Sequence, residues 1–365
     1  MPDQTNQRNA LKKLGRRALI SLAGACVLMP WRRAHAFPGI ITQALAADLA
    51  AASETLLVAG PPAGRLAQWA KLLCPLIGPA LWAGGTVSWN PVGAADGVTA
   101  ANQFDAQVSP DGNTALLLPG AAATAQLIGD PRARFDAGSW VAGFAGICST
   151  LAMGRVPLSE LPTATPLRVL AADPSGTDLP TLLGLSLLGY NVRPISPQSV
   201  LGDGSTALLR GDADIATLSD SDVTRLPQWR NQGLVALFTL GAPDETGAPD
   251  PFFPDLPTLQ NLLLAKGIDP TRPLPTAWRA LAAAKQLAMA LVLPELTPPS
   301  RVAQWRQACA ESVASLTIQA IAATESLRFI TQPNASAVIS AITAPSGAQL
   351  ELHQWLANRL GWRPT

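Results

Sequence analysis

The sequence predicts an α/β fold built from two successive strand-loop-helix units. From residue 55 onward, short apolar runs with strand character alternate with segments of helical periodicity, which is the pattern of parallel α/β domains. Most of these runs end in a loop rich in Gly or Ala, and a second unit begins near Gly154. Parallel sheets place ligand sites at the carboxyl ends of their strands, so we expect these loops to form a binding site.

The first unit opens with an apolar strand that ends in a Gly- and Pro-rich loop at 60–64. Leu66, Trp69 and Leu73 then share one face of a helix that we expect to end at residue 76. A small-residue loop at 91–97 and a turn at 109–113 separate the next elements. The predicted strands are 55–59, 84–90, 114–118 and 141–152, and the predicted helices are 65–76 and 98–106.

The second unit repeats this alternation, with Pro180 at the first turn of its first helix, where proline is favoured. Its predicted strands are 167–172, 213–218 and 234–240, and its predicted helices are 180–188, 205–209 and 220–228. The last of these strands could return the chain to the first unit. The expected division is therefore a first lobe over 37–153, a second lobe over 154–240, and a return to the first lobe over 241–365.

The C-terminal third begins with a segment rich in Pro, Asp and Gly, at 241–257, which predicts a surface loop. Helical periodicity follows at 278–293, 301–323 and 349–360. With intervening strands, these helices would complete the first unit.

The first 36 residues have the three parts of a cleavable signal peptide: a cationic start, an apolar stretch at 18–29, and the small-residue pattern Ala-His-Ala before Phe37. We expect cleavage after Ala36 and a periplasmic protein. A twin arginine at 16–17 favours the twin-arginine pathway over general secretion, and the pathway stays open. A lipoprotein box at 23–26, ending in Cys26, ranks second because Ala23 stands where a larger aliphatic residue is usual.

The charge of the mature chain argues against a nucleic-acid partner. Residues 1–36 hold seven of the 26 basic residues and one of the 25 acidic residues, which leaves 19 basic against 24 acidic residues, a net charge of −5. Nucleic-acid binding requires a basic patch that neutralises phosphates.

Few residues in the mature chain could carry catalysis. His353 is the only histidine left after cleavage, and we expect it to face solvent or cap a helix. Nucleophile-elbow, zinc-protease, P-loop and dinucleotide-binding motifs are absent from the sequence, so it predicts no enzyme, no cofactor and no metal site. The remaining cysteines, Cys74, Cys148 and Cys309, permit one disulfide at most, and we expect each to be a small buried hydrophobe.

Several loops, in their order along the chain, resemble one family. The first lobe carries LLVAGPPAG at 56–64, NPVGAADG at 90–97 and SPDGNTALLL at 109–118. Later come TALLRGDADI at 206–215, FPDLPTL at 253–259 and LPELTPPSRV at 293–302. Together they resemble the Bug-type receptors, the extracytoplasmic solute-binding proteins of tripartite tricarboxylate transporters, over about residues 55–315.

The resemblance implies a two-lobed periplasmic-binding-protein fold of the type II kind, with a ligand cleft between the lobes. It also implies a monomer that binds a small organic acid without a cofactor and delivers it to membrane transporter subunits. Carried over residue by residue, the ligand-binding positions are Ala63, Gly64, Arg65, Ala95, Gly120, Ala121, Thr124, Ser175, Gly176, Thr177 and Ser219. Helix N-termini with unsatisfied N–H groups, approached through Gly or Ala, suit an anionic ligand on physical grounds as well.

Two loops depart from the family pattern. Gly64 is followed by Arg65 where the family usually has a second Gly and then an Asp, and the third loop has no hydroxyl until Thr124. Either Arg65 replaces the lost donors for an anionic ligand, or the site has become apolar or inactive. The alternative role of Arg65 is that of a solvated residue in the first helical turn. In the second lobe, Ser175 and Thr177 either donate to the ligand or belong to a loop held by local capping through Thr177 or Asp178. The alternative function is a diverged binding-fold protein that acts as a sensory or interaction subunit without transport.

Overall fold

A computed structural model describes residues 53–200, 202–242 and 248–363. The predicted signal peptide lies outside these residues. Within the described ranges, no helix combines the length and the hydropathy that a membrane span requires.

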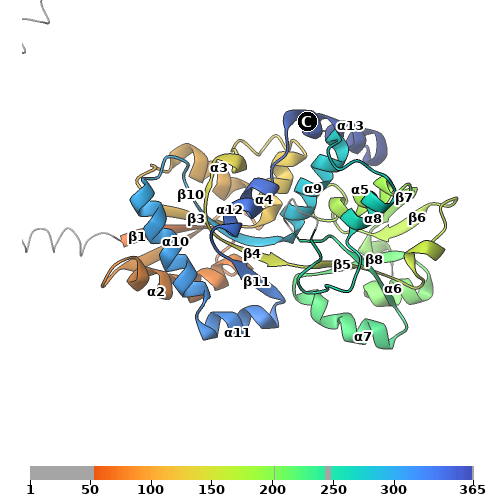
Figure 1. Cartoon of the computed structure of the whole chain (residues 1–365), viewed down its shortest axis with the longest axis horizontal. Helices are drawn as coiled ribbons and strands as arrows, with labels where there is room; N and C mark the ends of the chain where they lie inside the picture. The colour runs from red at the N-terminus through yellow and green to blue at the C-terminus, as the bar shows by residue number, and fades with distance from the viewer. Residues whose placement is uncertain (1–52, 201, 243–247, 364–365) are drawn as a thin grey trace, which may run out of the picture. The chain divides into compact units, whose positions relative to one another are not determined.

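The first sheet has six strands in the order β11-β4-β10-β3-β1-β2 (Figure 1). Its strands are β1 (Ser53–Ala59), β2 (Thr86–Val92), β3 (Thr114–Leu118), β4 (Val141–Cys148), β10 (Leu287–Leu293) and β11 (Leu327–Ile330). The strands β1, β2 and β3 run parallel, whereas β10 is antiparallel to both of its neighbours. The predicted parallel sheet is therefore a mixed sheet.

The second sheet has five strands in the order β7-β6-β8-β5-β9. Its strands are β5 (Thr150–Gly154), β6 (Leu167–Leu170), β7 (Val192–Ile195), β8 (Ile215–Ser219) and β9 (Val235–Thr239). This sheet is mixed too, because β6 is parallel to β7 and β8 while β5 is antiparallel to β8 and β9.

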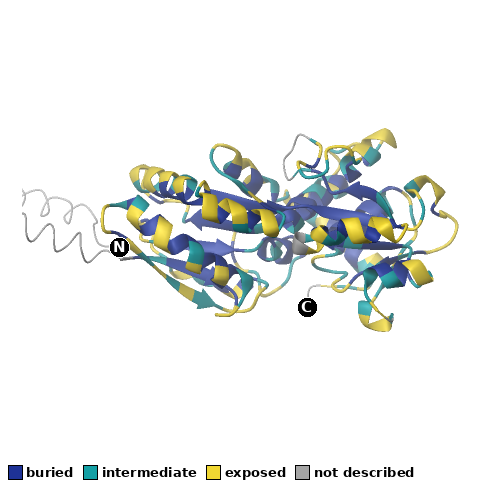
Figure 2. Ribbon diagram, turned by 90° about the horizontal axis from the view of Figure 1, so that it is seen from below, coloured by how far each residue is buried: buried dark blue, intermediate teal, exposed yellow. Residues whose placement is uncertain are grey.

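Helices cover the strands, so that buried residues concentrate in the strands and exposed residues on the outer faces of the helices (Figure 2). The helices are α2 (Arg65–Leu81), α3 (Val98–Gln107), α4 (Gly120–Leu127), α5 (Leu179–Leu187), α6 (Gly204–Arg210), α7 (Leu226–Asn231), α8 (Leu259–Ala265), α9 (Pro273–Gln286), α10 (Pro299–Val313), α11 (Leu316–Thr324), α12 (Asn334–Ala341) and α13 (Ser346–Leu360). Short 3₁₀ helices are η1 (Ala137–Ser139), η2 (Leu158–Glu160), η3 (Pro197–Ser199) and η4 (Asp220–Arg225). The predicted alternation of strands and helices is confirmed, and strand 114–118 has the expected bounds.

The predicted strand over 141–152 is two strands in two different sheets. Its apolar residues run on without a turn signal, yet β4 belongs to the first sheet and β5 to the second, with Ser149 between them. The chain thus passes between the sheets at Ser149, five residues before the predicted lobe boundary at Gly154. The division into lobes by residue range stays a prediction.

The predicted helix over 278–293 is also wrong in its second half. Residues 273–286 form α9, but the apolar run that follows is β10, which lies between β3 and β4 in the first sheet. Every side chain of β10 except Ala288 is buried. A wholly apolar run fits a buried helix and a buried strand equally well, so periodicity could not distinguish them.

The sequence predicts that the C-terminal elements complete the first unit, but some of them pack against the second sheet instead. Leu259, Trp278, Leu352 and Leu356 belong to the core that includes β6 and α5 of the second sheet. The strand β9 also stays in the second sheet. The return to the first sheet comes where α9 passes into β10, about 45 residues later than residue 240.

Two further helix boundaries differ from the prediction. Helix α2 continues to Leu81 through Pro75 and Pro79, because both prolines lie on its exposed face while Ile77 and Leu81 pack into the core. The predicted helix over 301–323 is divided into α10 and α11 by Ser315, whose hydroxyl accepts a hydrogen bond from the backbone N–H of Ile318.

A buried carboxyl group lies beside the passage between the sheets. Asp250 is fully buried, and its Oδ1 accepts hydrogen bonds from the Ser149 hydroxyl at 2.6 Å and the Phe252 N–H at 2.9 Å. Its Oδ2 has no hydrogen-bond partner in the described structure. Burial raises the pKa of Asp250 above its ordinary 3.8 despite these hydrogen bonds.

We therefore expect Asp250 to reduce the stability of the fold as the pH rises. Between pH 3.8 and its raised pKa, the folded state holds the proton that the unfolded state has released, so the free energy of unfolding falls with increasing pH. Urea titrations from pH 4 to pH 8 should show this fall in the wild type and a smaller one in Asp250→Asn. Parallel pH profiles for the two proteins would contradict the assignment.

Candidate functional site

The candidate site forms where the parallel strands of the first sheet end. The strands β1, β2 and β3 point the same way, so the loops that follow them meet at one edge of the sheet. Two glycines have backbone conformations that these loops require. Gly60, at φ +112°, lies beside Ala95 of the second loop, and Gly97, at φ +79°, leaves room for Pro119 of the third, which a Cβ would approach to 2.7 Å. The three loops thus lie together, and their role as a ligand site stays a prediction.

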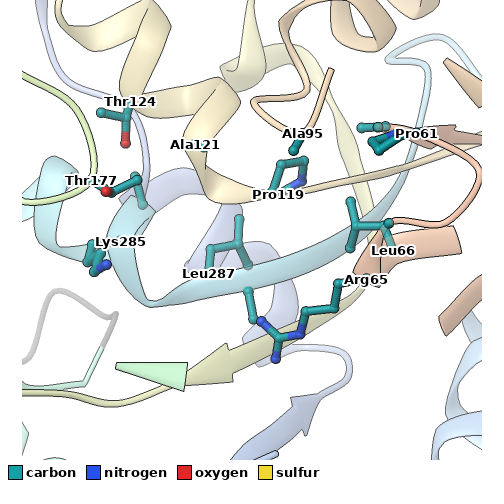
Figure 3. Close-up of a pocket in the computed structure, with 15 residues that line it drawn as sticks. Pro61, Arg65, Leu66, Ala95, Pro119, Ala121, Thr124, Thr177, Lys285 and Leu287 are labelled. Carbon is teal, nitrogen blue, oxygen red and sulfur yellow. The ribbon is translucent and has the colours of Figure 1, made fainter. Parts of the chain in front are cut away.

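These loops enclose a cavity of about 200 Å³ together with the end of α9 and the start of β10 (Figure 3). Its lining residues are Ala59, Gly60, Pro61, Gly64, Arg65, Leu66, Ala95, Pro119, Ala121, Thr124, Thr177, Ala284, Lys285, Leu287 and Ala288. Six of the predicted site residues are among them: Gly64, Arg65, Ala95, Ala121, Thr124 and Thr177. Among these lining residues, only Thr177 comes from the segment 150–239, which contains the strands of the second sheet. The lining residues include no carboxylate side chain.

Two helices begin at this cavity without side-chain caps. The N-cap residue of α2 is Gly64 and that of α4 is Pro119, and neither offers a side-chain acceptor to the first turn of its helix. A helix N-terminus carries unsatisfied N–H groups and partial positive charge. The cavity wall therefore favours an anion.

Arg65 lies at the cavity, but its charge is partnered. Its Nε donates to Glu325 Oε2 at 3.0 Å, and Glu325 also accepts a hydrogen bond from Trp69 Nε1 at 3.2 Å. Both charged side chains are about one-third exposed. The structure agrees with neither hypothesis alone, that of a ligand donor or that of a solvated residue. Arg65 does line the cavity, but Glu325, which follows α11, neutralises its charge.

Lys285 is a cavity residue that the sequence interpretation missed. It lies in the last turn of α9, is half-buried, and lies on the same side of the cavity as Thr177 in Figure 3. In the described part of the chain it makes no hydrogen bond or ion pair. The sequence predicts one continuous helix over 278–293, with Lys285 in its middle. Nothing in that prediction placed Lys285 at the ends of the strands.

The loop over 173–178 contributes less to an anion site than predicted. Asp173 Oδ2 accepts the Thr177 N–H at 3.2 Å, and its backbone oxygen accepts the Gly176 N–H at 3.2 Å. Asp178 Oδ2 in turn accepts the N–H groups of Ala172 and Asp173. The loop is thus held by local hydrogen bonds that its backbone N–H groups donate to its own aspartates, which is the alternative that the sequence left open.

Ser175 and Gly176 line a second hollow of about 210 Å³, which shares Ala121, Thr124 and Thr177 with the cavity. The remaining predicted residues line neither hollow: Ala63, Gly120 and Ser219. Gly120 has a packing role, since a Cβ there would lie 2.0 Å from the carbonyl oxygen of Ala284. Whether any of the predicted residues binds a ligand stays a prediction.

The other chemically reactive residues have structural roles. His353 Nε2 lies 3.0 Å from the carbonyl oxygen of Leu127, the last residue of α4, so of the two expected roles it has the capping one. Cys74, Cys148 and Cys309 are buried, as expected, and form no disulfide within the described residues. Burial raises the pKa of the Cys74 thiol to about 12. No cluster of His, Cys, Asp or Glu suited to a metal ion exists among the described residues.

Known proteins match this chain in structure but not in sequence. No protein-family model and no curated protein matches the sequence. Among solved structures, a TctC solute-binding protein from Polaromonas, without ligand, superposes with a TM-score of 0.56 over 84% of this chain and 98% of that one, at 16% identity. This chain has the fold of a solute-binding protein. The two-lobed α/β fold predicted from the sequence is therefore confirmed.

Two further structures match at lower similarity. MatC from Rhodopseudomonas palustris, with bound malate, has a TM-score of 0.47 and 18% identity over 83% of this chain and 97% of that one. An R. palustris protein with adipate has a TM-score of 0.48 and 15% identity over 86% of this chain and 98% of that one.

Proposed function

We propose that this protein is a periplasmic solute-binding receptor that captures a small organic carboxylate and delivers it to a transporter of the tripartite tricarboxylate type. The carrying observation is the cavity at the ends of β1 and β3, where α2 and α4 begin without side-chain caps and no carboxylate lines the wall. The fold shared with a TctC solute-binding protein and the family resemblance of the loops support the same function.

The proposal includes export and the absence of catalysis. The pattern of residues 1–36 supports a cleavable signal peptide and a periplasmic location. The lining residues include no His, Cys, Asp or Glu, which is in keeping with a binding role. We propose further that the protein is a monomer that binds its ligand without a cofactor. Membrane transporter subunits are the proposed partners, and nucleic acid is not.

A thermal-shift screen against mono- and dicarboxylates of two to eight carbons tests this function. A ligand that binds only the folded state stabilises it by about 2.7 kcal/mol at a concentration one hundred times its Kd, which is seen as a higher melting temperature. We expect at least one carboxylate to raise the melting temperature, whereas amines and uncharged amides of the same length should not. Each carboxylate is tested at about 10 mM, which is ten times the Kd of a millimolar binder. An unchanged melting temperature with every carboxylate at this concentration would reject the function.

A further inference from the structure

On the basis of the proposed function, we propose that Lys285 pairs with the carboxylate of the ligand and that the 173–178 loop disfavours a second carboxylate. The ligand class that follows is a monocarboxylate with an apolar body.

The first step is the unsatisfied charge of Lys285. Its side chain is half-buried in the cavity wall and has no hydrogen-bond or salt-bridge partner among the described residues. The other cation of the cavity, Arg65, is already paired with Glu325. An ammonium group at the wall of a cavity is stabilised by an anion that enters beside it, so a ligand carboxylate would supply the missing partner.

The position of Lys285 has a purely structural explanation that the experiment must separate. A lysine in the last turn of a helix is stabilised by the negative end of the helix dipole. Such a role concerns the stability of α9 and is independent of any ligand. Ligand affinity and melting temperature therefore distinguish the two roles.

The rest of the cavity is suited to an apolar group. Leu66, Pro119, Leu287 and Ala288 line it, and the polar side chains that join them are Arg65, Thr124, Thr177 and Lys285. In Figure 3, Leu287 lies between Arg65 and the side on which Thr124 and Thr177 lie, and Leu66 lies on the side of Arg65. A ligand held at Lys285 would place its hydrocarbon chain against these apolar residues.

The second hollow determines what the far end of the ligand meets. It continues from the cavity past Thr124 and Thr177, and Asp173 lies in its wall. Asp96 and Asp130 also line it, and they share one cation, Arg132, at 3.0 and 2.6 Å. The wall of this hollow thus holds three carboxylates and one guanidinium group, which is paired with two of them. A second ligand carboxylate would be repelled there, whereas a neutral end would not.

Three ligands of one chain length test this assignment: hexanoate, 6-aminohexanoate and adipate, titrated by calorimetry into the wild-type protein. We expect hexanoate to bind about tenfold or more tightly than adipate, and 6-aminohexanoate to bind at least as tightly as hexanoate. Asp173→Asn should raise the affinity for adipate relative to that for hexanoate and so reduce the difference between the two ligands.

The lysine variants test the carboxylate partner. Lys285→Met should weaken hexanoate binding about tenfold or more, since it removes a charge-assisted contact, and Lys285→Arg should restore part of the affinity. Lys71→Met, a matched change at an exposed lysine of α2 outside the cavity, should leave the affinity unchanged.

Each other result overturns the inference. Wild-type affinity for hexanoate in Lys285→Met, together with a lower melting temperature, would assign Lys285 to the helix dipole alone. Tighter binding of adipate than of hexanoate would reject the role of the 173–178 loop. Failure of all three ligands would reject the ligand class, and the wider carboxylate screen would then show whether the receptor function itself stands.

Discussion

Replacing Arg301 with methionine should lower the free energy of unfolding by about 3–5 kcal/mol, the usual cost of leaving a buried charge without its partner. Glu54 is only 1% exposed, and its Oε1 accepts a hydrogen bond from Arg301 at 2.5 Å. Burial raises the pKa of Glu54, and Arg301 opposes that rise. Methionine keeps the apolar contact over Trp82 but leaves the carboxylate without a cation.

The size of this effect is measured by urea unfolding at pH 7. Arg230→Met, at an exposed arginine of α7, is the matched control and should change the free energy of unfolding by less than about 0.5 kcal/mol. Glu54→Gln combined with Arg301→Met should recover a large part of the loss, because no charge is then buried. An Arg301→Met protein as stable as the control would show that the buried pair contributes little.

The sequence predicted those parts of the fold in which local pattern and tertiary environment agree. The run at 114–118 is apolar and bounded by a turn and a Gly-rich loop, and it forms β3 with these bounds. The errors occurred where an apolar run had no punctuation. Nothing in the residues 141–152 marks Ser149 as the point where the chain changes sheets, and nothing at Gln286 marks the change from α9 to β10.

The candidate site could be predicted to the extent that it follows from strand direction. Gly64, Ala95 and Ala121 line the cavity because three parallel strands end together. Lys285 could not be predicted, because it reaches the cavity from an element 164 residues farther along the chain than Ala121. The loop after β6 was predicted as an anion site from its N–H groups, but its own Asp173 is the acceptor for Thr177. Sequence indicates donors at a loop; which acceptor binds them depends on the folded geometry.

The second large expected effect is at Gly120, which the family resemblance assigned to the ligand and the structure places against α9. An added Cβ would lie 2.0 Å from the carbonyl oxygen of Ala284 and 2.9 Å from the Cβ of Leu287. Because the nearest atom belongs to the backbone of a packed helix, the contact cannot be relieved by a rotamer change. We expect Gly120→Ala to lower the free energy of unfolding by about 3 kcal/mol, at the upper end of the usual cost of overpacking.

The matched control is Gly347→Ala, since a Cβ at this position of α13 meets no atom within 4 Å. It should be neutral or slightly stabilising, because alanine favours a helix more than glycine does. Separation of α4 from α9 would also move Ala121 and Thr124 relative to Lys285, so Gly120→Ala should weaken carboxylate binding under conditions where it remains folded. If Gly120→Ala instead weakened binding without changing the free energy of unfolding, Gly120 would be assigned to the ligand site. A packing role would change the stability as well, whereas direct contact with the ligand would change the affinity alone.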